Sequence, residues 1–111
     1  MAIKRLYREA YQLKETQCNI IADRPDGVQA AIESIKRNRG QLEVYGKAHP
    51  KFFWTLKPVP VPKEPAVSKL MAEAAEKANV GPMAAVAGVL ADLAVKDMLR
   101  VGCGVAVVEK R

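Results

Sequence analysis

Apolar and polar positions alternate loosely over residues 3–15, where apolar or aromatic side chains beginning with Ile3 are interleaved with polar ones beginning with Lys4. A period of two predicts a strand with one exposed face. Residues 18–22 form a second apolar run, and the short polar stretch 15–17 between the two runs suits a hairpin. The chain is therefore predicted to begin with two antiparallel strands.

The last apolar run of the chain is Val105–Val108. It has no polar alternation, which is typical of a strand buried on both faces in the middle of a sheet. We predict a strand over 103–109, after which the sequence holds no further strand. A central strand without a following partner leaves an unpaired edge that invites association. The sequence therefore predicts a fold that stops partway, and either self-association or pairing with a complementary chain through Val105–Val108.

Three helices are predicted between these strands. The first, over 24–47, follows an apolar stripe at helical spacing, although glycines weaken it and favour a break near Gly46. A proline-rich connector at 57–65 is predicted to be extended. The second helix covers 66–79 and the third 82–101. Together these elements predict an α+β fold in which helices pack on one face of an antiparallel sheet.

Length and charge narrow the number of domains and the kinds of partner that the sequence allows. Residues 1–111, half of them hydrophobic, are enough to bury one modest core, so we predict a single partial domain. Residues 1–63 carry 12 Lys or Arg against 6 Asp or Glu, whereas residues 64–111 carry 6 of each. The basic residues are dispersed, which is typical of a solvated face. A phosphate-bearing ligand, nucleic acid or an acidic partner is the alternative that this excess leaves open.

No targeting or membrane-spanning segment is predicted. The chain starts with charged residues where a signal peptide needs an apolar stretch. The run Val80–Val95 is shorter than the span of about 20 residues that a membrane requires, and it contains Asp92. We predict a cytoplasmic protein without a membrane partner.

Few residues suit catalysis or metal binding. Cys18 and Cys103 lie far apart, with no Cys or His nearby at metal-ligand spacing, so we predict reduced structural thiols and no metal site. The single histidine, His49, stands beside a proline and is predicted to lie at the surface. The aromatic run 52–54 has two interpretations, a hydrophobic plug or a stacking platform for an aromatic ligand or base.

The most suggestive candidate for a ligand site is the run 80–88. A glycine followed by a proline at a helix start leaves the next backbone amides unpaired, and the helix dipole there favours an anion. We therefore predict that a phosphate-bearing ligand binds at Gly81, Pro82, Met83, Ala84 and Ala85.

Three motifs resemble successive signatures of one family: Ile21-Ala-Asp-Arg-Pro-Asp, Val80-Gly-Pro-Met-Ala-Ala-Val-Ala-Gly and Val107-Val-Glu. Their order and intervals are similar to those of an uncharacterised protein family of bacteria and archaea. That family belongs to the ApbE-like superfamily, named for flavin transferases once called thiamine biosynthesis lipoproteins. The resemblance extends over essentially the whole chain, and the second motif is its most specific part.

The resemblance implies a duplicated, T-fold-type architecture of two similar halves, of which this chain matches the N-terminal half. It implies a flavin or other nucleotide-type ligand, with FAD and Mg²⁺ as cofactors of complete members and Gly81–Ala84 lining the cleft between the halves. Where members continue with an asparagine, two glycines and an aspartate, this chain has Lys110 and Arg111. That missing motif builds much of the superfamily's flavin and metal site, so we expect no catalysis by this chain alone.

Two other functions remain open. A small basic nucleic-acid-binding module would use the N-terminal charge and the aromatic run 52–54, although the sequence contains no nucleic-acid-binding motif. A structural assembly module would pair through the 105–108 strand without binding any ligand.

Overall fold

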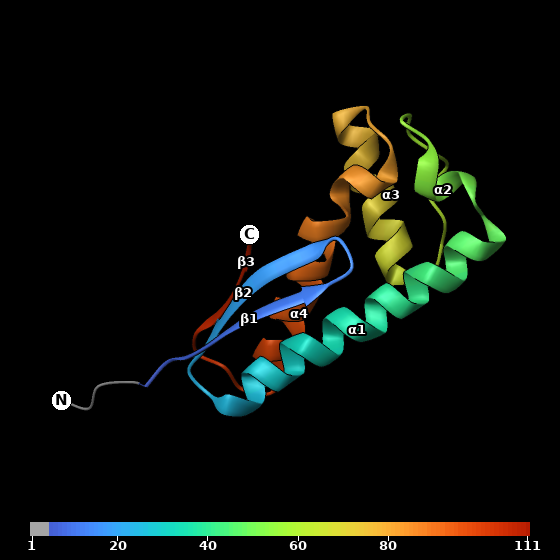
Figure 1. The fold of residues 1–111 in the computed structure, drawn as a ribbon. Helices are drawn as coiled ribbons and strands as arrows, with labels where there is room; N and C mark the ends of the chain where they lie inside the picture. Colours follow the sequence, from blue (N-terminus) through green and yellow to red (C-terminus); the bar gives the residue numbers. More distant parts are fainter. Residues whose placement is uncertain (1–4) are drawn as a thin grey trace. The chain divides into compact units, whose positions relative to one another are not determined.

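The computed structural model describes residues 5–111 (Figure 1). Its elements follow in the order β1 (Tyr7–Leu13), β2 (Thr16–Ala22), α1 (Pro25–Ala48), α2 (Lys51–Trp54), α3 (Ala66–Ala78), the 3₁₀ helix η1 (Pro82–Ala85), α4 (Val86–Arg100) and β3 (Ala106–Lys110). The predicted α+β class is confirmed. The beginning of the predicted first strand, at Ile3 and Lys4, lies outside the described residues.

The chain divides into two compact units. The first contains the residues up to Lys36 together with Ala91–Arg111, and we call it the sheet unit. The second, Arg37–Leu90, contains no strand among its residues and is called the helical unit. Helices α1 and α4 each contribute residues to both units, so each unit is described below by its own contacts.

The sheet is antiparallel, with β2 between β1 and β3. Tyr11 lies opposite Cys18 across β1 and β2, and Ile20 lies opposite Val108 across β2 and β3. Within the described residues β3 is therefore an edge strand rather than the central strand that its composition predicts. Its Ala106, Val107 and Val108 are all half-buried. Partial cover on both faces is enough to account for consecutive apolar residues at a sheet edge.

Helices cover one face of the sheet, as predicted. Alternate side chains of β2 point to that face and are buried, whereas Asn19 between them is exposed. The buried core combines these strand residues with residues of α1, α4 and the turn after α4: Cys18, Ile20, Ala22, Ala31, Ile35, Ala94, Met98 and Cys103. This small, apolar interior holds the sheet unit together.

Hydrogen bonds of Asp23 connect the start of α1 to the turn before β3 in the sheet unit. Both carboxylate oxygens of Asp23 accept from the amide of Gly104, at 3.0 and 3.1 Å. The amide of Asp23 donates to the carbonyl of Val105 at 3.4 Å. A Cβ added at Gly27 would come within 2.3 Å of the Sγ of Cys103. The first motif of the sequence thus joins the end of β2 to the turn before β3.

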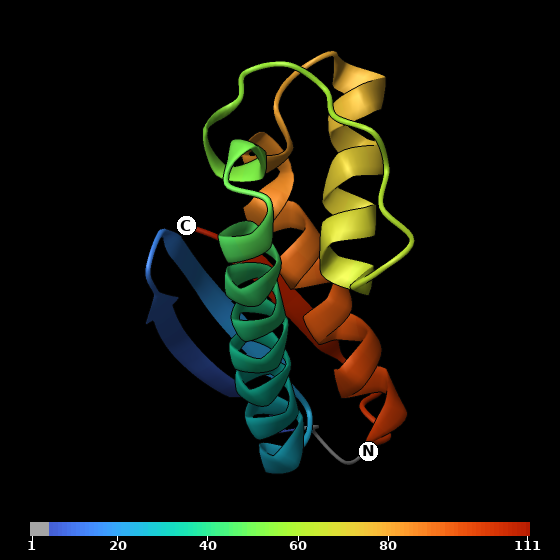
Figure 2. The same cartoon turned by 90° about the vertical axis from the view of Figure 1, so that its right-hand side faces the viewer.

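The helical unit consists of the C-terminal half of α1, α2, α3, η1 and the start of α4. Both α2 and α3 pack against η1. Helix α3 ends at Asn79, which adopts the left-handed conformation (φ 56°, ψ 47°), while its amide and that of Val80 donate to the last carbonyls of the helix. Figure 2 shows the chain between α2 and α3 as an arch without helix or strand.

Three local features differ from the sequence-based expectation. Helix α1 runs through Gly46 without a break. Glycine fits this position because the ring of Phe53 occupies the space where a side chain would stand; a Cβ there would lie 1.5 Å from the Cε2 of Phe53. The short α2 forms after Pro50, between the predicted first helix and the predicted connector, where no helix was predicted. The helix predicted to start at Pro82 begins instead as the 3₁₀ helix η1 and becomes α-helical at Val86.

Candidate ligand-binding site

The glycine loop singled out by the sequence is partly buried. Gly81 and Pro82 are both buried, and a Cβ added at Gly81 would come within 1.9 Å of the carbonyl oxygen of Thr55. Glycine at this position therefore allows a close approach of two backbone segments. The amide of Ala84 donates to the carbonyl of Gly81 at 3.2 Å, so it is not the unpaired amide that the sequence predicted.

The rest of this loop reaches the surface. Ala84 and Gly88 are exposed, and Met83, Ala85 and Ala87 are half-buried. No atom lies within 4 Å of a Cβ added at Gly88, so the surface beside it is open. Of the five predicted site residues, Gly81 and Pro82 therefore serve packing, whereas the other three are accessible to a ligand.

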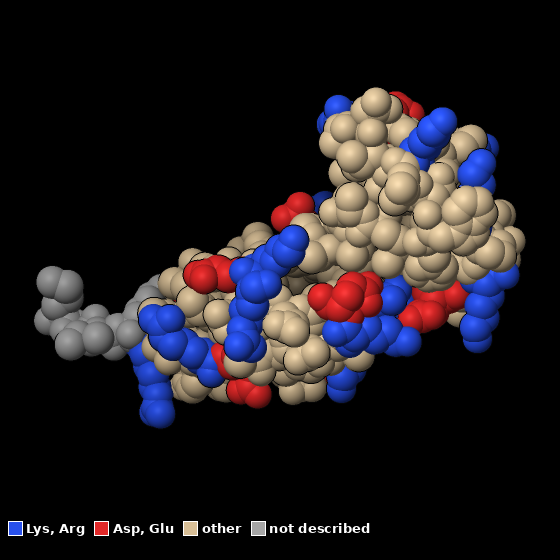
Figure 3. Space-filling view, turned by 45° about the horizontal axis from the view of Figure 1, so that its top comes forward, with Lys and Arg blue, Asp and Glu red and all other residues tan. Residues whose placement is uncertain are grey.

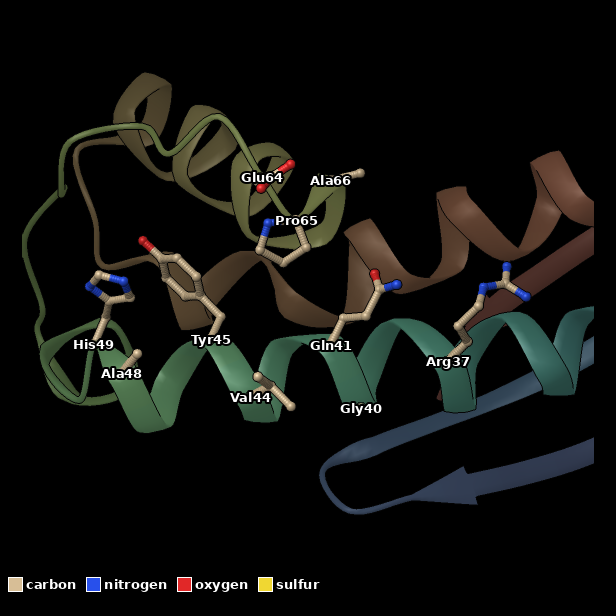
Figure 4. A pocket seen from close by; sticks show the side chains of 10 residues that line it. All are labelled: Arg37, Gly40, Gln41, Val44, Tyr45, Ala48, His49, Glu64, Pro65 and Ala66. Atoms are coloured by element: carbon tan, nitrogen blue, oxygen red, sulfur yellow. The ribbon is translucent and has the colours of Figure 1, made fainter.

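A separate groove of about 940 Å³ lies entirely within the helical unit. One wall is the C-terminal half of α1 and the other is the segment that leads into α3 (Figure 4). The lining residues are Arg37, Gly40, Gln41, Val44, Tyr45, Ala48, His49, Glu64, Pro65 and Ala66. In size and in its mixture of apolar and polar side chains the groove is typical of small-molecule sites.

Aromatic side chains form one end of this groove. The rings of Tyr45 and His49 stack with centroids 4.3 Å apart and planes inclined by 26°. The edge of Phe52 meets Tyr45 at 5.0 Å and 78°. Because Tyr45 is held between two rings, its position is fixed before any ligand binds.

The three residues of the aromatic run at 52–54 differ in burial, and the buried ones fit the predicted hydrophobic plug. Phe52 is buried and Phe53 is half-buried, with its ring 5.7 Å from the guanidinium carbon of Arg39. Trp54 is 67% exposed. Two of the three rings thus pack as a plug, and only Trp54 is free to contact another molecule.

The polar end of the groove contains Arg37 and Gln41, with Glu64 on the opposite wall. Gln41 and Tyr45 project from α1 on the side of the segment that carries Glu64 and Pro65, whereas Arg37 lies farther along the helix (Figure 4). Sequence reasoning missed these residues. The signal was the ladder Arg37, Gln41, Tyr45, His49 at intervals of four, which places a cation, an amide and two rings along one face of a helix.

The two cysteines are buried. Cys18 and Cys103 are free and buried, and burial raises the pKa of both thiols; Asp23 and Asp26 raise that of Cys103 further. Over residues 5–111 no group of three or more His, Cys, Asp or Glu side chains is placed to hold a metal ion.

On the face shown in Figure 3, basic and acidic side chains are interspersed.

The family of the chain follows from its whole length. The family model described as AbpE bacteria matches residues 3–110. The chain belongs to this family. It is an uncharacterised, ApbE-related family, in agreement with the resemblance of the three sequence motifs.

Curated relatives are archaeal proteins named UPF0280 protein. One from Methanosarcina acetivorans is 41% identical over 103 residues, which is 92% of this chain and 41% of the relative. Another, from Methanococcoides burtonii, is 40% identical over 103 residues, which is 92% of this chain and 44% of the relative. One from Methanococcus maripaludis is 38% identical over 106 residues, or 95% and 43% of the two chains. The chain spans about two fifths of the length of these relatives.

Proposed function

We propose that this chain is a ligand-binding part of an ApbE-related protein and that the groove of the helical unit binds a flavin or other nucleotide-type ligand. The observation that carries the proposal is the arrangement of the groove, with a fixed aromatic pair at one end and a cation at the other. A nucleotide-type ligand has the matching parts, a flat ring system and a phosphate.

The dimensions of the groove suit such a ligand. Tyr45 stands eight residues after Arg37 on α1, which corresponds to about 12 Å along the helix axis. The long Arg37 side chain shortens the distance over which the ligand must reach. Gln41 lies between them and offers an amide that can donate to or accept from the ring system.

The loop that the sequence predicted remains a second location for the same ligand. Met83, Ala84 and Ala85 are accessible, and the open surface at Gly88 continues theirs. Small side chains let a flat ring approach the backbone closely. Gly81 and Pro82 would contribute by holding the loop rather than by touching the ligand.

Flavin transfer by this chain alone is not part of the proposal. A complete flavin-transfer site with Mg²⁺ needs a cluster of oxygen ligands. Among the described residues no group of three or more His, Cys, Asp or Glu side chains comes together, so they provide no all-protein cage for that ion. A Mg²⁺ site of that kind would need further ligands from another chain or from a longer family protein.

The first experiment compares FMN with riboflavin, which lacks the phosphate, by titrating flavin fluorescence. We expect FMN to bind the chain at least about tenfold more tightly, since a charge-assisted hydrogen bond to Arg37 is available only to the phosphate. Arg37→Gln should remove that difference while leaving riboflavin binding unchanged. Equal binding of both flavins by the unmodified chain would contradict the proposed role of Arg37.

A pair of glycine variants then locates the site. Gly40 lies in the groove and Gly88 beside the predicted loop; both are exposed helical residues with nothing within 4 Å of an added Cβ. Gly40→Leu should block flavin binding and Gly88→Leu should not. The reverse result would move the site to the loop, and no flavin binding by any of the three proteins would refute the ligand class.

Assembly through β3 is a second proposed role, because the half-buried Ala106–Val108 lie at an unpaired sheet edge of the described chain. Self-association or pairing with a complementary chain would extend the sheet, as a half of a duplicated T-fold-type architecture requires. Light scattering should find a dimer that Val107→Lys converts to a monomer. A monomer at all concentrations, with no binding of a complementary chain, would exclude this role.

A further inference from the structure

Two large apolar side chains project into solvent just after α2. Leu56 is 86% exposed and Trp54 is 67% exposed. Neither lines the groove described above. Apolar groups that protrude in this way usually mark a contact with another molecule.

The backbone that carries them is firmly held. Thr55, between the two, is buried; its amide donates to the carbonyl of Lys51 at 2.9 Å, and its hydroxyl accepts from the amide of Lys57 at 3.2 Å. The carbonyl of Thr55 packs directly against Gly81. Trp54 and Leu56 therefore project from an anchored turn.

The charge around this turn has a single sign. Residues 44–63 contain four lysines and no Asp or Glu. All four lysines, Lys47, Lys51, Lys57 and Lys63, are exposed. This stretch is thus a basic segment with two protruding apolar side chains, which we call the Trp54–Leu56 patch.

We propose that the Trp54–Leu56 patch binds the surface of an anionic lipid membrane. Charge complementarity favours this partner, because lysines attract acidic lipid headgroups, while Trp and Leu enter the boundary between headgroups and acyl chains. A fluid surface needs no shaped complement and contacts protruding side chains first. Nucleic acid fits less well, since the more exposed of the two side chains, Leu56, cannot stack on a base.

This surface contact differs from the membrane partner that the sequence argued against. That argument concerned a spanning segment, and in the described residues no single helix is long and apolar enough to cross a bilayer. The exposure of Trp54 and Leu56 could not be read from their composition.

Trp54 is the only tryptophan of the chain, so its fluorescence reports directly on the patch. Vesicles of phosphatidylcholine mixed with phosphatidylglycerol should shift its emission to shorter wavelength and carry the protein down on centrifugation. Vesicles of phosphatidylcholine alone should do neither. Raising the salt concentration should weaken the binding, because the lysines act through screened charge.

Matched variants test the two contributions separately. Leu56→Gln should weaken vesicle binding about tenfold or more, whereas Leu99→Gln, at a 55% exposed leucine of α4, should have no effect. Lys57→Gln should weaken it about fivefold, whereas Lys96→Gln on α4 should not change it. None of these exposed positions contributes to a core, so each variant remains folded.

Several results would overturn the proposal. One is an emission shift of Trp54 with a single-stranded oligonucleotide but not with acidic vesicles, which would assign the patch to nucleic acid. Equal binding to neutral and acidic vesicles, or equal effects of Leu56→Gln and Leu99→Gln, would also reject it. These outcomes are independent of flavin binding, so the proposed ligand groove is tested separately.

Discussion

The sheet unit and the helical unit use apolar side chains differently. In the sheet unit, the residues of β2 that face the helices are almost completely buried; Ile20 and Ala22 are 0% exposed. The helical unit also has buried residues, such as Leu42 and Met71, yet it carries the most exposed apolar side chains of the described chain: Val44 at 71%, Trp54 at 67% and Leu56 at 86%.

The difference separates residues that close the fold from residues that stay at the surface. Polar groups of the sheet unit are engaged in closing it, as the contact of Asp23 with Gly104 shows. In the helical unit, tight backbone contacts such as that of Gly81 with Thr55 hold the frame on which the groove and the Trp54–Leu56 patch are built. Rigid local packing thus supports surfaces that remain open to partners.

The largest expected effect comes from emptying the interior of the sheet unit. Ile20→Ala should lower the free energy of unfolding by about 2–5 kcal/mol, because it removes buried methyl groups and leaves a cavity. Leu56→Ala, at an exposed position, should change it by less than about 0.5 kcal/mol. Urea denaturation followed by circular dichroism measures both free energies of unfolding. Similar losses for Ile20→Ala and Leu56→Ala would contradict the difference in burial between the two positions.

Two glycines of the helical unit should respond in opposite directions. Gly81→Ala should lower the free energy of unfolding by about 1–3 kcal/mol, because the new Cβ collides with the Thr55 carbonyl. Gly88→Ala should raise it by up to about 1 kcal/mol, since the site is open and alanine favours helix. Urea denaturation measures both changes. An unchanged free energy of unfolding for Gly81→Ala would refute the close approach of Gly81 to the Thr55 carbonyl.

The thiols report on closure of the sheet unit alone, since both cysteines belong to it. Burial raises the pKa of Cys18 and Cys103, so near pH 8 each should react with a thiol reagent far more slowly than in denaturant. Above about pH 8.5 the unfolded chain loses its thiol protons first. The free energy of unfolding should therefore fall as pH rises further, by at most about 1.4 kcal/mol per pH unit and thiol.

Stability measured against pH in a Cys18→Ala, Cys103→Ala double variant provides the control, because the part of the slope due to the thiols should vanish. Rapid labelling of both cysteines in the folded protein would show that the sheet unit is more open than described.

A small stabilising effect is expected at Gly40, which lies in the groove with nothing within 4 Å of an added Cβ. Gly40→Ala should raise the free energy of unfolding by about 0.5–1 kcal/mol through helix propensity. Thermal unfolding measures the gain. A loss instead would mean that Gly40 makes a close contact not seen in the described surface.

Much of the fold was predictable because local patterns carry it. The alternation predicted for the first strand and the helical stripe of α3 appear in the sequence as they do in the structure. The edge position of β3 was not predictable, because consecutive apolar residues suit both a central strand and a half-covered edge. The continuity of α1 at Gly46 was missed for a different reason: the ring of Phe53, seven residues away, makes glycine necessary there.

The place of the groove was not predictable from the sequence. The loop 80–88 was found by motif, but its Gly81 and Pro82 are buried, and the groove depends on Glu64 and Pro65 lying across from Arg37 and Tyr45. Those residues are about twenty to thirty positions apart in the chain, and no local spacing rule relates them.

By itself, the sequence determined the α+β class, the family and the absence of a metal-binding motif, because each depends on residue types at short, regular intervals. Only the tertiary structure decided which apolar side chains are exposed, which glycines are required and where the groove opens. Those properties depend on the distance between segments remote in the chain, as Thr55 and Gly81 illustrate: neither residue alone indicates that their backbones touch.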